Sequence, residues 1–300
     1  MAIKYAGYIY SPGTKAGFNK LQKYGIPRPI FSVENKMTKH LTKTYEDILL
    51  RVLKDFQRVS KNSGLTTDNE LEDLAKFFEK LQGKENSIEQ RANMVMALEN
   101  LKREWVESED DPEFDEYSDE WRAKLDNVLF KNQAQFIKRL QEDGSEKFKN
   151  RLFDFSIDKQ KLFNANMKGI RDLYLDNSIA RIKGEENLLK KRFLEKVNAW
   201  VIGESDVLDI REITKALQHD SSRMARFFAR DQLSRLNKAV MISSYKTAGA
   251  TKVKWLTVGD VRVRNSHAKL NGKIFDINNL PEEINDYNCR CGLMPVEWED

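Results

Sequence analysis

The chain has 300 residues, of which 40% are hydrophobic and 33% charged, and its formal net charge is +4 at pH 7. Its 14 glycines and 6 prolines are too few for a loop-rich or all-β architecture. The composition favours long solvated helices over a compact metabolic enzyme, arranged as two domains or as one helical body.

The N-terminus gives no sign of export or membrane insertion. Residues 1–20 lack the apolar core of a secretory signal, and no window approaches the roughly 18 uninterrupted apolar residues of a membrane span. The only two cysteines lie one residue apart, so a disulfide framework is excluded. We therefore expect a soluble protein made in a reducing cytoplasm, with no membrane-spanning segment.

Residues 1–33 are predicted to form an extended arm. They have neither helical nor strand periodicity, and they contain three prolines, four glycines and the aromatic residues Tyr5, Tyr8, Tyr10, Phe18 and Tyr24. Because these aromatic side chains need a surface to cover them, we expect the arm to pack on its own domain or on a neighbouring chain. A frayed terminus is the alternative.

Residues 34–203 are predicted to form an elongated helical scaffold region. Apolar residues follow helical spacing over Leu41–Val59, Leu71–Leu81, about 87–106, Trp121–Leu140, about 157–182 and Leu189–Val201. Between them, the acidic stretch ESEDDPEFDEYSDE (residues 107–120) contains Pro112, and we expect a solvated loop there, or an acidic decoy for a basic partner. No catalytic set of residues is found before residue 200, so this region is interpreted as a scaffold.

Residues 204–300 form the third predicted region, and their charge is unevenly distributed. Residues 220–270 contain eleven Lys or Arg and three acidic residues, whereas residues 271–300 contain two basic and seven acidic residues. The small net charge of the chain therefore conceals a basic block that is followed by an acidic end.

The basic block contains a predicted helix over about 221–247. Ala225, Ala229, Leu233, Leu236 and Val240 form an apolar stripe, and Arg223, Arg226, Arg230 and Asn237 fall on an adjacent face. Guanidinium groups bind phosphates and carboxylates well, so we predict non-specific contact with double-stranded DNA through these three arginines and Lys238, Lys252 and Lys254. The alternative is a solvated or internally salt-bridged face, with arginine paired to the acidic end.

After Gly249 the periodicity changes from helical to that of strands. Val253, Trp255 and Thr257 alternate with Lys254 and Leu256, a short helical turn is expected at 266–270, and Asn271-Gly272 is a turn signal before a strand at 273–277. Residues 289–296 supply a third strand. The predicted fold is therefore mainly α, with a small C-terminal α+β module that contains a three-stranded antiparallel sheet.

His267, Cys289 and Cys291 are the candidate metal ligands of this module. Zinc binds thiolate and imidazole readily, and Asp260, Asp286 or water would complete four ligands. Alternation along a strand would turn both cysteines to one face. The alternative is two reduced cysteines packed on one face, with His267 hydrogen-bonded. No enzyme activity is expected, because neither a Gly-rich oxyanion loop nor a third group that orients His267 is evident.

Four stretches carry a resemblance to a known family: ARDQLSRLNKA, WLTVGDVRVRNSH, LNGKIF and NCRCGLMPV. They resemble the head-morphogenesis domain of tailed bacteriophages, in the minor head proteins that are similar to phage Mu protein F, over roughly residues 200–298. The matching positions are Trp255, Asp260, Arg264, His267, Gly272, Cys289, Arg290, Cys291 and Pro295. Many relatives look to carry Cys-x-x-Cys where this chain has Arg264-Asn265-Ser266-His267, which leaves a loop held by an Arg264–Asp260 salt bridge as an alternative to zinc.

The resemblance implies a structural protein of the virion, located in the capsid interior near the portal vertex after assembly in the host cytoplasm. The implied partners are the portal protein, the major capsid or scaffolding proteins and DNA, and the implied roles are head assembly and genome packaging or ejection. A structural zinc is the one cofactor suggested. Because the signature ends close to Asp300, no following toxin domain is expected. The alternative is an injected, toxin-like effector with a zinc-dependent or Cys-His C-terminal module.

Overall fold

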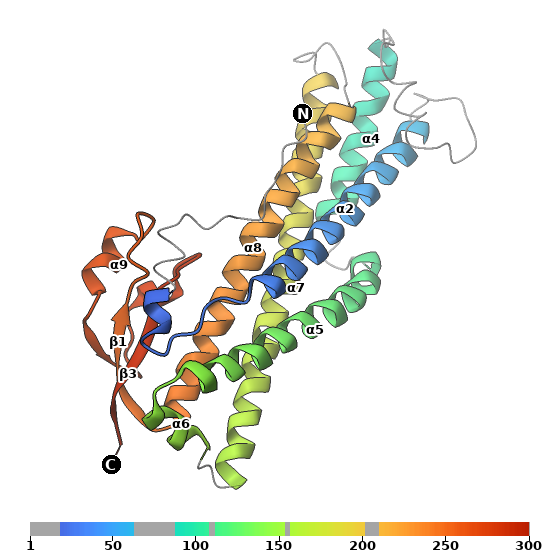
Figure 1. Ribbon diagram of the computed structural model, residues 1–300. Coiled ribbons are helices and arrows are strands. Elements are labelled where there is room, and N and C mark those ends of the chain that lie inside the picture. Colours follow the sequence, from blue (N-terminus) through green and yellow to red (C-terminus); the bar gives the residue numbers. More distant parts are fainter. Residues whose placement is uncertain (1–18, 63–87, 108–111, 154–156, 202–209, 300) are drawn as a thin grey trace. The chain divides into compact units, whose positions relative to one another are not determined.

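A computed structural model of the protein describes residues 19–62, 88–107, 112–153, 157–201 and 210–299 (Figure 1). Its helices are α2 (Phe31–Asn62), α4 (Ile88–Glu107), α5 (Pro112–Asp143), α6 (Glu146–Phe153), α7 (Ile157–Val201) and α8 (Ile210–Thr247). They are followed by β1 (Ala250–Leu256), α9 (Asn265–Leu270), β2 (Ile274–Asp276), the 3₁₀ helix η1 (Glu282–Asn285) and β3 (Gly292–Trp298). The predicted fold class is confirmed. Within the described ranges, no helix is both long and apolar enough to span a membrane.

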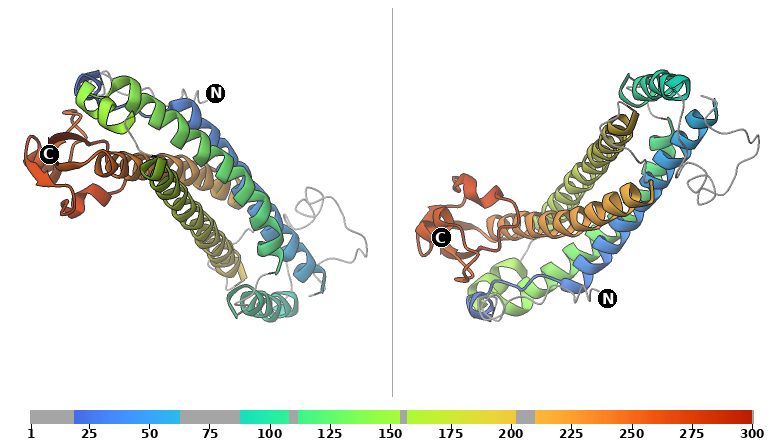
Figure 2. Two further views of the ribbon diagram at one scale, coloured as in Figure 1. Left: turned by 90° about the horizontal axis from the view of Figure 1, so that it is seen from below. Right: turned by 90° about the horizontal axis from the view of Figure 1, so that it is seen from above.

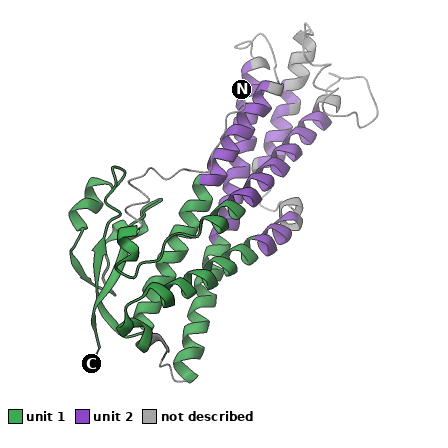
Figure 3. Cartoon of the chain, in the orientation of Figure 1, with its two compact units in different colours: residues 1–37, 125–176, 227–300 green, residues 38–124, 177–226 purple. Residues whose placement is uncertain are grey.

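The chain divides into two compact units that are not continuous in sequence (Figure 3). Unit 1 comprises residues 1–37, 125–176 and 227–300, and unit 2 comprises residues 38–124 and 177–226. The long helices α2, α5, α7 and α8 thus contribute residues to both units. The predicted division of the chain into three consecutive regions, with boundaries at 33/34 and 203/204, stays a prediction.

Unit 2 is a helical unit whose core follows the predicted helical stripes. The residues of α2 from Leu41 to Val59 that were expected to face inward are buried, and Phe56 packs edge-on against Phe193 of α7 with 5.2 Å between the ring centroids. Glu186 of α7, itself buried, pairs with Lys190 at 3.0 Å. The periodicity of apolar residues therefore located this core correctly.

Two predictions about helix boundaries were wrong. The acidic stretch is not a loop from Pro112 onward, because α5 begins at that proline. Proline fits the first helical position, where its missing N–H needs no partner and its fixed φ suits the helix. The two helices expected on either side of Gly184 form the single helix α7, because one glycine costs only about 1 kcal/mol in a helix. The Arg181–Glu185 ion pair spans this glycine, and the Glu186–Lys190 pair follows it.

Other boundaries differ more modestly. Helix α8 begins at Ile210 rather than near residue 221, and α6 was not predicted. The helix expected over Leu71–Leu81 lies outside the described residues.

The core of unit 1 joins α6, α8 and the C-terminal strand. Phe148 of α6 packs edge-on against Tyr245 of α8 at 5.0 Å and stacks on Trp298 of β3 at 6.3 Å. The Tyr245 hydroxyl donates to the Leu293 carbonyl oxygen at 3.2 Å, and burial raises the pKa of this phenol. Three segments that are far apart in sequence are thereby fixed together.

The sheet of unit 1 is three-stranded and antiparallel, with the order β2-β1-β3. Val253 of β1 lies between Phe275 and Pro295 in the register, and Trp255 lies opposite Leu293. Gly272 has a φ of +83°, which suits glycine at the predicted turn before β2. In both further views the sheet and α9 lie together beside the C-terminal end of α8 (Figure 2).

The described part of the predicted arm packs on unit 1. Leu21, Ile26 and Ile30 are buried, and the Arg139 guanidinium of α5 donates to the Arg28 and Pro29 carbonyl oxygens at 3.0 and 3.3 Å. A Cβ added at Gly292 would lie 2.7 Å from Ile26 Cγ2, so the arm closely approaches the start of β3. Residues 1–18 of the arm lie outside the described residues.

We predict that Phe148→Ala destabilises unit 1 by about 3–5 kcal/mol, because it removes a fully buried ring from the contact of α6, α8 and β3. The matched control is Phe130→Ala on α5 in the same unit, where the ring is 53% exposed and the loss should stay below about 1 kcal/mol. Urea unfolding followed by tryptophan fluorescence measures both. Equal losses for the two variants would contradict this account of the core.

Candidate metal centre

Three buried side chains of unit 1 bring their ligand atoms together. His267 comes from α9, and Cys289 and Cys291 come from the segment between η1 and β3. The His267 Nδ1 atom lies 3.4 Å from each Sγ atom, and the three ligand atoms all lie within 4.8 Å of one another. The residues singled out from the sequence therefore form one cluster that could hold a metal ion.

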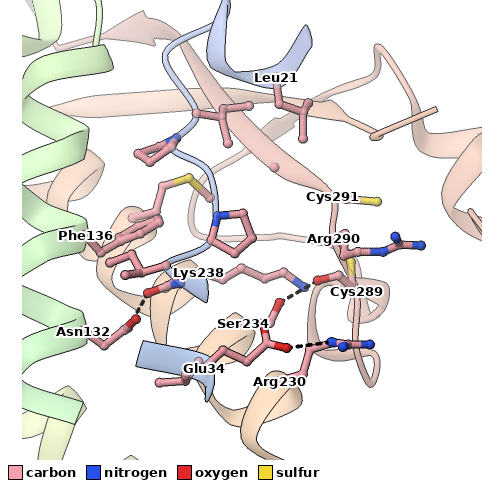
Figure 4. Close-up of a pocket in the computed structure, with 18 residues that line it drawn as sticks. Leu21, Glu34, Asn132, Phe136, Arg230, Ser234, Lys238, Cys289, Arg290 and Cys291 are labelled. Atoms are coloured by element: carbon pink, nitrogen blue, oxygen red, sulfur yellow. Dashed lines mark hydrogen bonds and ion pairs between the residues drawn. The ribbon is translucent and has the colours of Figure 1, made fainter. Parts of the chain in front are cut away.

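The two cysteines reach the cluster by a different route from the one predicted. Strand β3 begins only at Gly292, so alternation along a strand does not place them. Instead α8 positions their segment: the Ser234 hydroxyl donates to the Cys289 carbonyl oxygen at 2.7 Å, and the backbone N–H of Asn288 donates to Asp231 at 2.7 Å. Asn288 has a φ of +51°, which turns the chain there. Figure 4 shows Ser234 beside Cys289.

The ring of His267 is held from its other side. Its Nε2 atom lies 2.7 Å from Asp286 Oδ2, and its ring packs edge-on against Trp255 at 5.6 Å. Asp286 is thus the third group that orients His267, which the sequence analysis did not find. Because Asp286 binds the nitrogen that faces away from the thiols, it does not join them as a ligand.

Asp260 is also engaged elsewhere. It accepts from the Arg290 guanidinium at 3.0 and 3.3 Å, and Arg264 pairs with Asp286 at 3.6 Å. The salt bridge expected between Arg264 and Asp260 is therefore replaced by two other pairs. Of the three proposed sources of a fourth ligand, neither carboxylate belongs to the cluster that the described residues form.

The two thiols differ in acidity. A hydrogen bond from Cys291 lowers the pKa of the Cys289 thiol to about 5 against the effect of burial, and the ammonium of Lys238 acts in the same direction. The hydrogen bond to Cys289 raises the pKa of Cys291. The thiolate is the form of cysteine that binds metal ions, so the lowered pKa of Cys289 favours metal binding.

A cleft of about 470 Å³ opens onto the cluster, and its lining includes His267, Cys289 and Cys291. Arg230, Arg262, Arg264 and Arg290 also line it, and no carboxylate appears among the described residues of its lining. A smaller cavity of about 70 Å³ lies between the arm, α5, α8 and the cysteine segment (Figure 4). The cleft therefore brings four guanidinium groups beside the three ligand residues.

The residues predicted to bind DNA are placed very differently from one another. Arg223 and Arg226 belong to unit 2, where the Arg223 side chain is 71% exposed and pairs with Asp220. Arg230 belongs to unit 1 and pairs with Glu34 of α2 at 3.2 Å, as Figure 4 shows. Lys238 is buried and donates to the Ile284 carbonyl oxygen at 3.2 Å.

The two strand lysines lie on β1. Lys252 is exposed and pairs with Glu297 of the acidic end at 2.8 Å, and Lys254 is partly exposed. Arg230 thus makes an internal salt bridge, which was the alternative considered for the arginine face. Its partner is Glu34 rather than a residue of the acidic end. The DNA contact itself stays a prediction.

Residues 200–294 match the family model described as Phage Mu protein F like protein. An uncharacterized protein of Haemophilus influenzae (strain ATCC 51907 / DSM 11121 / KW20 / Rd) is 35% identical over 117 residues, which cover 36% of this chain and 26% of that protein. No solved structure matches the chain. The resemblance carried by the motifs is thus confirmed: the segment is phage Mu protein F-like, and it points to a phage head-morphogenesis family.

We predict that Asp260→Ala destabilises unit 1 by about 3–5 kcal/mol, because it leaves the mostly buried Arg290 guanidinium without its carboxylate partner. The control is Glu297→Ala, which breaks the exposed pair with Lys252 in the same unit and should cost less than about 1 kcal/mol. Urea unfolding gives both values. A cost for Asp260→Ala no larger than that of the control would show that the Arg290–Asp260 pair does not stabilise the cleft.

Proposed function

We propose that this protein is a structural minor head protein of a tailed phage, associated with the portal inside the capsid. The observation that carries the proposal is the match of residues 200–294 to the phage Mu protein F-like family, which takes in α8, β1, β2, the start of β3 and the His-Cys-Cys cluster. In this role the protein acts in head assembly and in genome packaging or ejection. Its partners are the portal protein and the major capsid or scaffolding proteins.

The role proposed for the C-terminal segment is architectural rather than enzymatic. The contacts of unit 1 support this, because Ser234 of α8 holds the thiol-bearing segment, Lys238 holds η1, and Tyr245 holds β3 on the same helix. Such contacts hold the end of the chain as a rigid surface, which is what a component of a particle needs.

The location has a direct test. In phage particles purified after assembly, mass spectrometry should detect the chain at a few copies, and it should co-purify with the portal protein from portal-containing procapsids. A matched preparation of particles assembled without the portal should lack it. Its absence from all particles, or an equal amount without the portal, would contradict the proposed location.

Contact with double-stranded DNA is the second part of the proposal. Arg223 and Arg226 of unit 2 and Lys252 and Lys254 of unit 1 remain its candidates, because Arg230 and Lys238 make internal contacts. Phosphate contacts of this kind give binding without sequence preference that weakens with salt.

We expect the double variant Arg223→Gln/Arg226→Gln to reduce the salt dependence of DNA binding. Each lost phosphate contact lowers the slope of log K against log salt by about 0.9, so the expected change is about 2. The control is Lys102→Gln/Arg103→Gln, which removes two exposed charges from α4 of the same unit. Fluorescence anisotropy on a random-sequence duplex measures the slope. Wild-type protein without salt-sensitive binding would make these residues candidates for a protein interface.

A structural zinc is the third part of the proposal. The supporting observation is the convergence of two thiols and an imidazole within 4.8 Å, a donor set that zinc prefers. When bound, zinc would fix α9 to the segment before β3 and stabilise the fold through its ligand bonds.

We predict about one zinc per chain in protein purified without chelator. Cys289→Ser and His267→Ala should each reduce the zinc content to background, and a chelator should lower the melting temperature of the wild type. The control is His219→Ala, which changes an exposed histidine of unit 2. Elemental analysis gives the metal content, and metal-free protein of unchanged stability would end the zinc proposal.

One observation favours a second candidate, an injected effector with a Cys-His module. Asp286, His267 and the thiols are aligned at 2.7 and 3.4 Å, the order of groups that activates a nucleophilic cysteine. Under this candidate, expression of the chain harms host cells, and Cys289→Ser removes the harm while the protein still folds. Host cells that grow normally with the wild-type chain would exclude it.

A further inference from the structure

The separations within the cluster fit a tetrahedral metal ion. Zinc–sulfur bonds of about 2.3 Å and zinc–nitrogen bonds of about 2.0–2.1 Å place sulfur and nitrogen about 3.5 Å apart around a tetrahedral ion. The observed Nδ1–Sγ distances are both 3.4 Å. The thiols and the imidazole therefore need only small adjustments to bind the same ion.

Asp286 orients the ring of His267 and is not itself a ligand of the metal. It holds Nε2 of His267 at 2.7 Å, which leaves Nδ1, the nitrogen that faces the thiols, as the metal-binding atom. Asp286 also pairs with Arg264 at 3.6 Å, so its carboxylate is held on the Nε2 side of the ring. Metal-binding histidines commonly donate their second N–H to a carboxylate in this way.

The protein offers three ligands where a closed structural site has four. Within the part of the chain that the structure describes, no fourth His, Cys, Asp or Glu belongs to the cluster. All three ligand residues line the arginine-lined cleft, so the fourth coordination position faces that cleft. Zinc sites with three protein ligands keep this position for water or another exogenous ligand.

The cleft is suited to an anion. Four guanidinium groups line it, each with five N–H donors. Arg290 pairs with Asp260, and Arg264 pairs with Asp286 at 3.6 Å and donates to the Tyr287 carbonyl oxygen at 2.8 Å. Arg262 is exposed, and the Arg264 side chain is 47% exposed. Guanidinium donors match the tetrahedral oxygens of a phosphate group.

We propose that the cleft binds a phosphate group as the fourth ligand of the metal, with Arg262 and Arg264 holding its other oxygens. This inference rests on the zinc site proposed above. The phosphate belongs either to free inorganic phosphate or to the end of a nucleic acid strand, since both present the same tetrahedral group to the cleft.

The test uses the full chain loaded with Co²⁺ in place of zinc, because the visible absorption of Co²⁺ reports its ligands. Titration with inorganic phosphate at constant ionic strength should shift the absorption bands in a saturable way. A second titration with a 5′-phosphorylated oligonucleotide, against the same strand without the phosphate, distinguishes the two sources. If the phosphorylated strand binds more tightly than the strand without the phosphate, the ligand is a nucleic-acid end. If it binds equally or more weakly, the ligand is free phosphate.

Variants assign the binding to the cleft. Arg262→Gln and Arg264→Gln should each weaken phosphate binding at least tenfold while the Co²⁺ content and the circular dichroism stay unchanged. Lys138→Gln, which removes an exposed charge from α5 in the same unit, should leave it unaltered.

The outcomes separate the two proposals. If the protein binds neither Co²⁺ nor zinc, the zinc proposal itself fails. If Co²⁺ binds but its absorption bands do not change when phosphate is added, the fourth position is closed, and this inference alone is overturned. Phosphate binding that survives both arginine variants would also overturn it, because the site would then lie outside the cleft.

Discussion

Hydrogen bonds with three side chains of α8 hold η1 and the segment that follows it, and the rest of the candidate site depends on these bonds. Asp231 accepts from the Asn288 backbone, Ser234 donates to the Cys289 carbonyl oxygen, and Lys238 donates to the Ile284 carbonyl oxygen. These three side chains lie on successive turns of α8, so the helix fixes the spacing of the backbone groups that they bind. The thiols, the orienting carboxylate Asp286 and the cleft all follow from that placement.

Several charged side chains of α8 make contacts within the protein itself. Arg230 pairs with Glu34, Arg235 pairs with Asp231, and Lys238 is buried beside the cysteine segment. A basic stretch in a sequence therefore does not imply an equally basic surface, because internal carboxylates and carbonyl oxygens occupy many of its donors. The concentration of arginine in the cleft next to the cluster is a different feature, since four guanidinium groups surround one space there.

Sequence reasoning located much of this architecture because its signals are local. The helical stripe of α2, the alternation around Trp255 and the Asn271-Gly272 turn each depend on neighbouring residues, and all three predictions are confirmed. It failed at Pro112 and Gly184, where residues that usually interrupt helices are tolerated at a first turn and within a long helix supported by ion pairs. The role of Asp286 was missed, because its approach to His267 is set by the turn after η1.

The sequence by itself determined the helical class, the small C-terminal sheet, the phage Mu protein F-like signature and the three side chains of the cluster. These follow from the periodicity of apolar residues, the turn residues and the residue types, all of which can be read directly from the sequence. Only the tertiary structure decided the salt-bridge partners, the face of His267 that meets the thiols and the arginines that share the cleft. Those choices bring together residues from α8, the loop before α9, α9 and the segment before β3, and no local pattern encodes distances between segments that are separated in sequence.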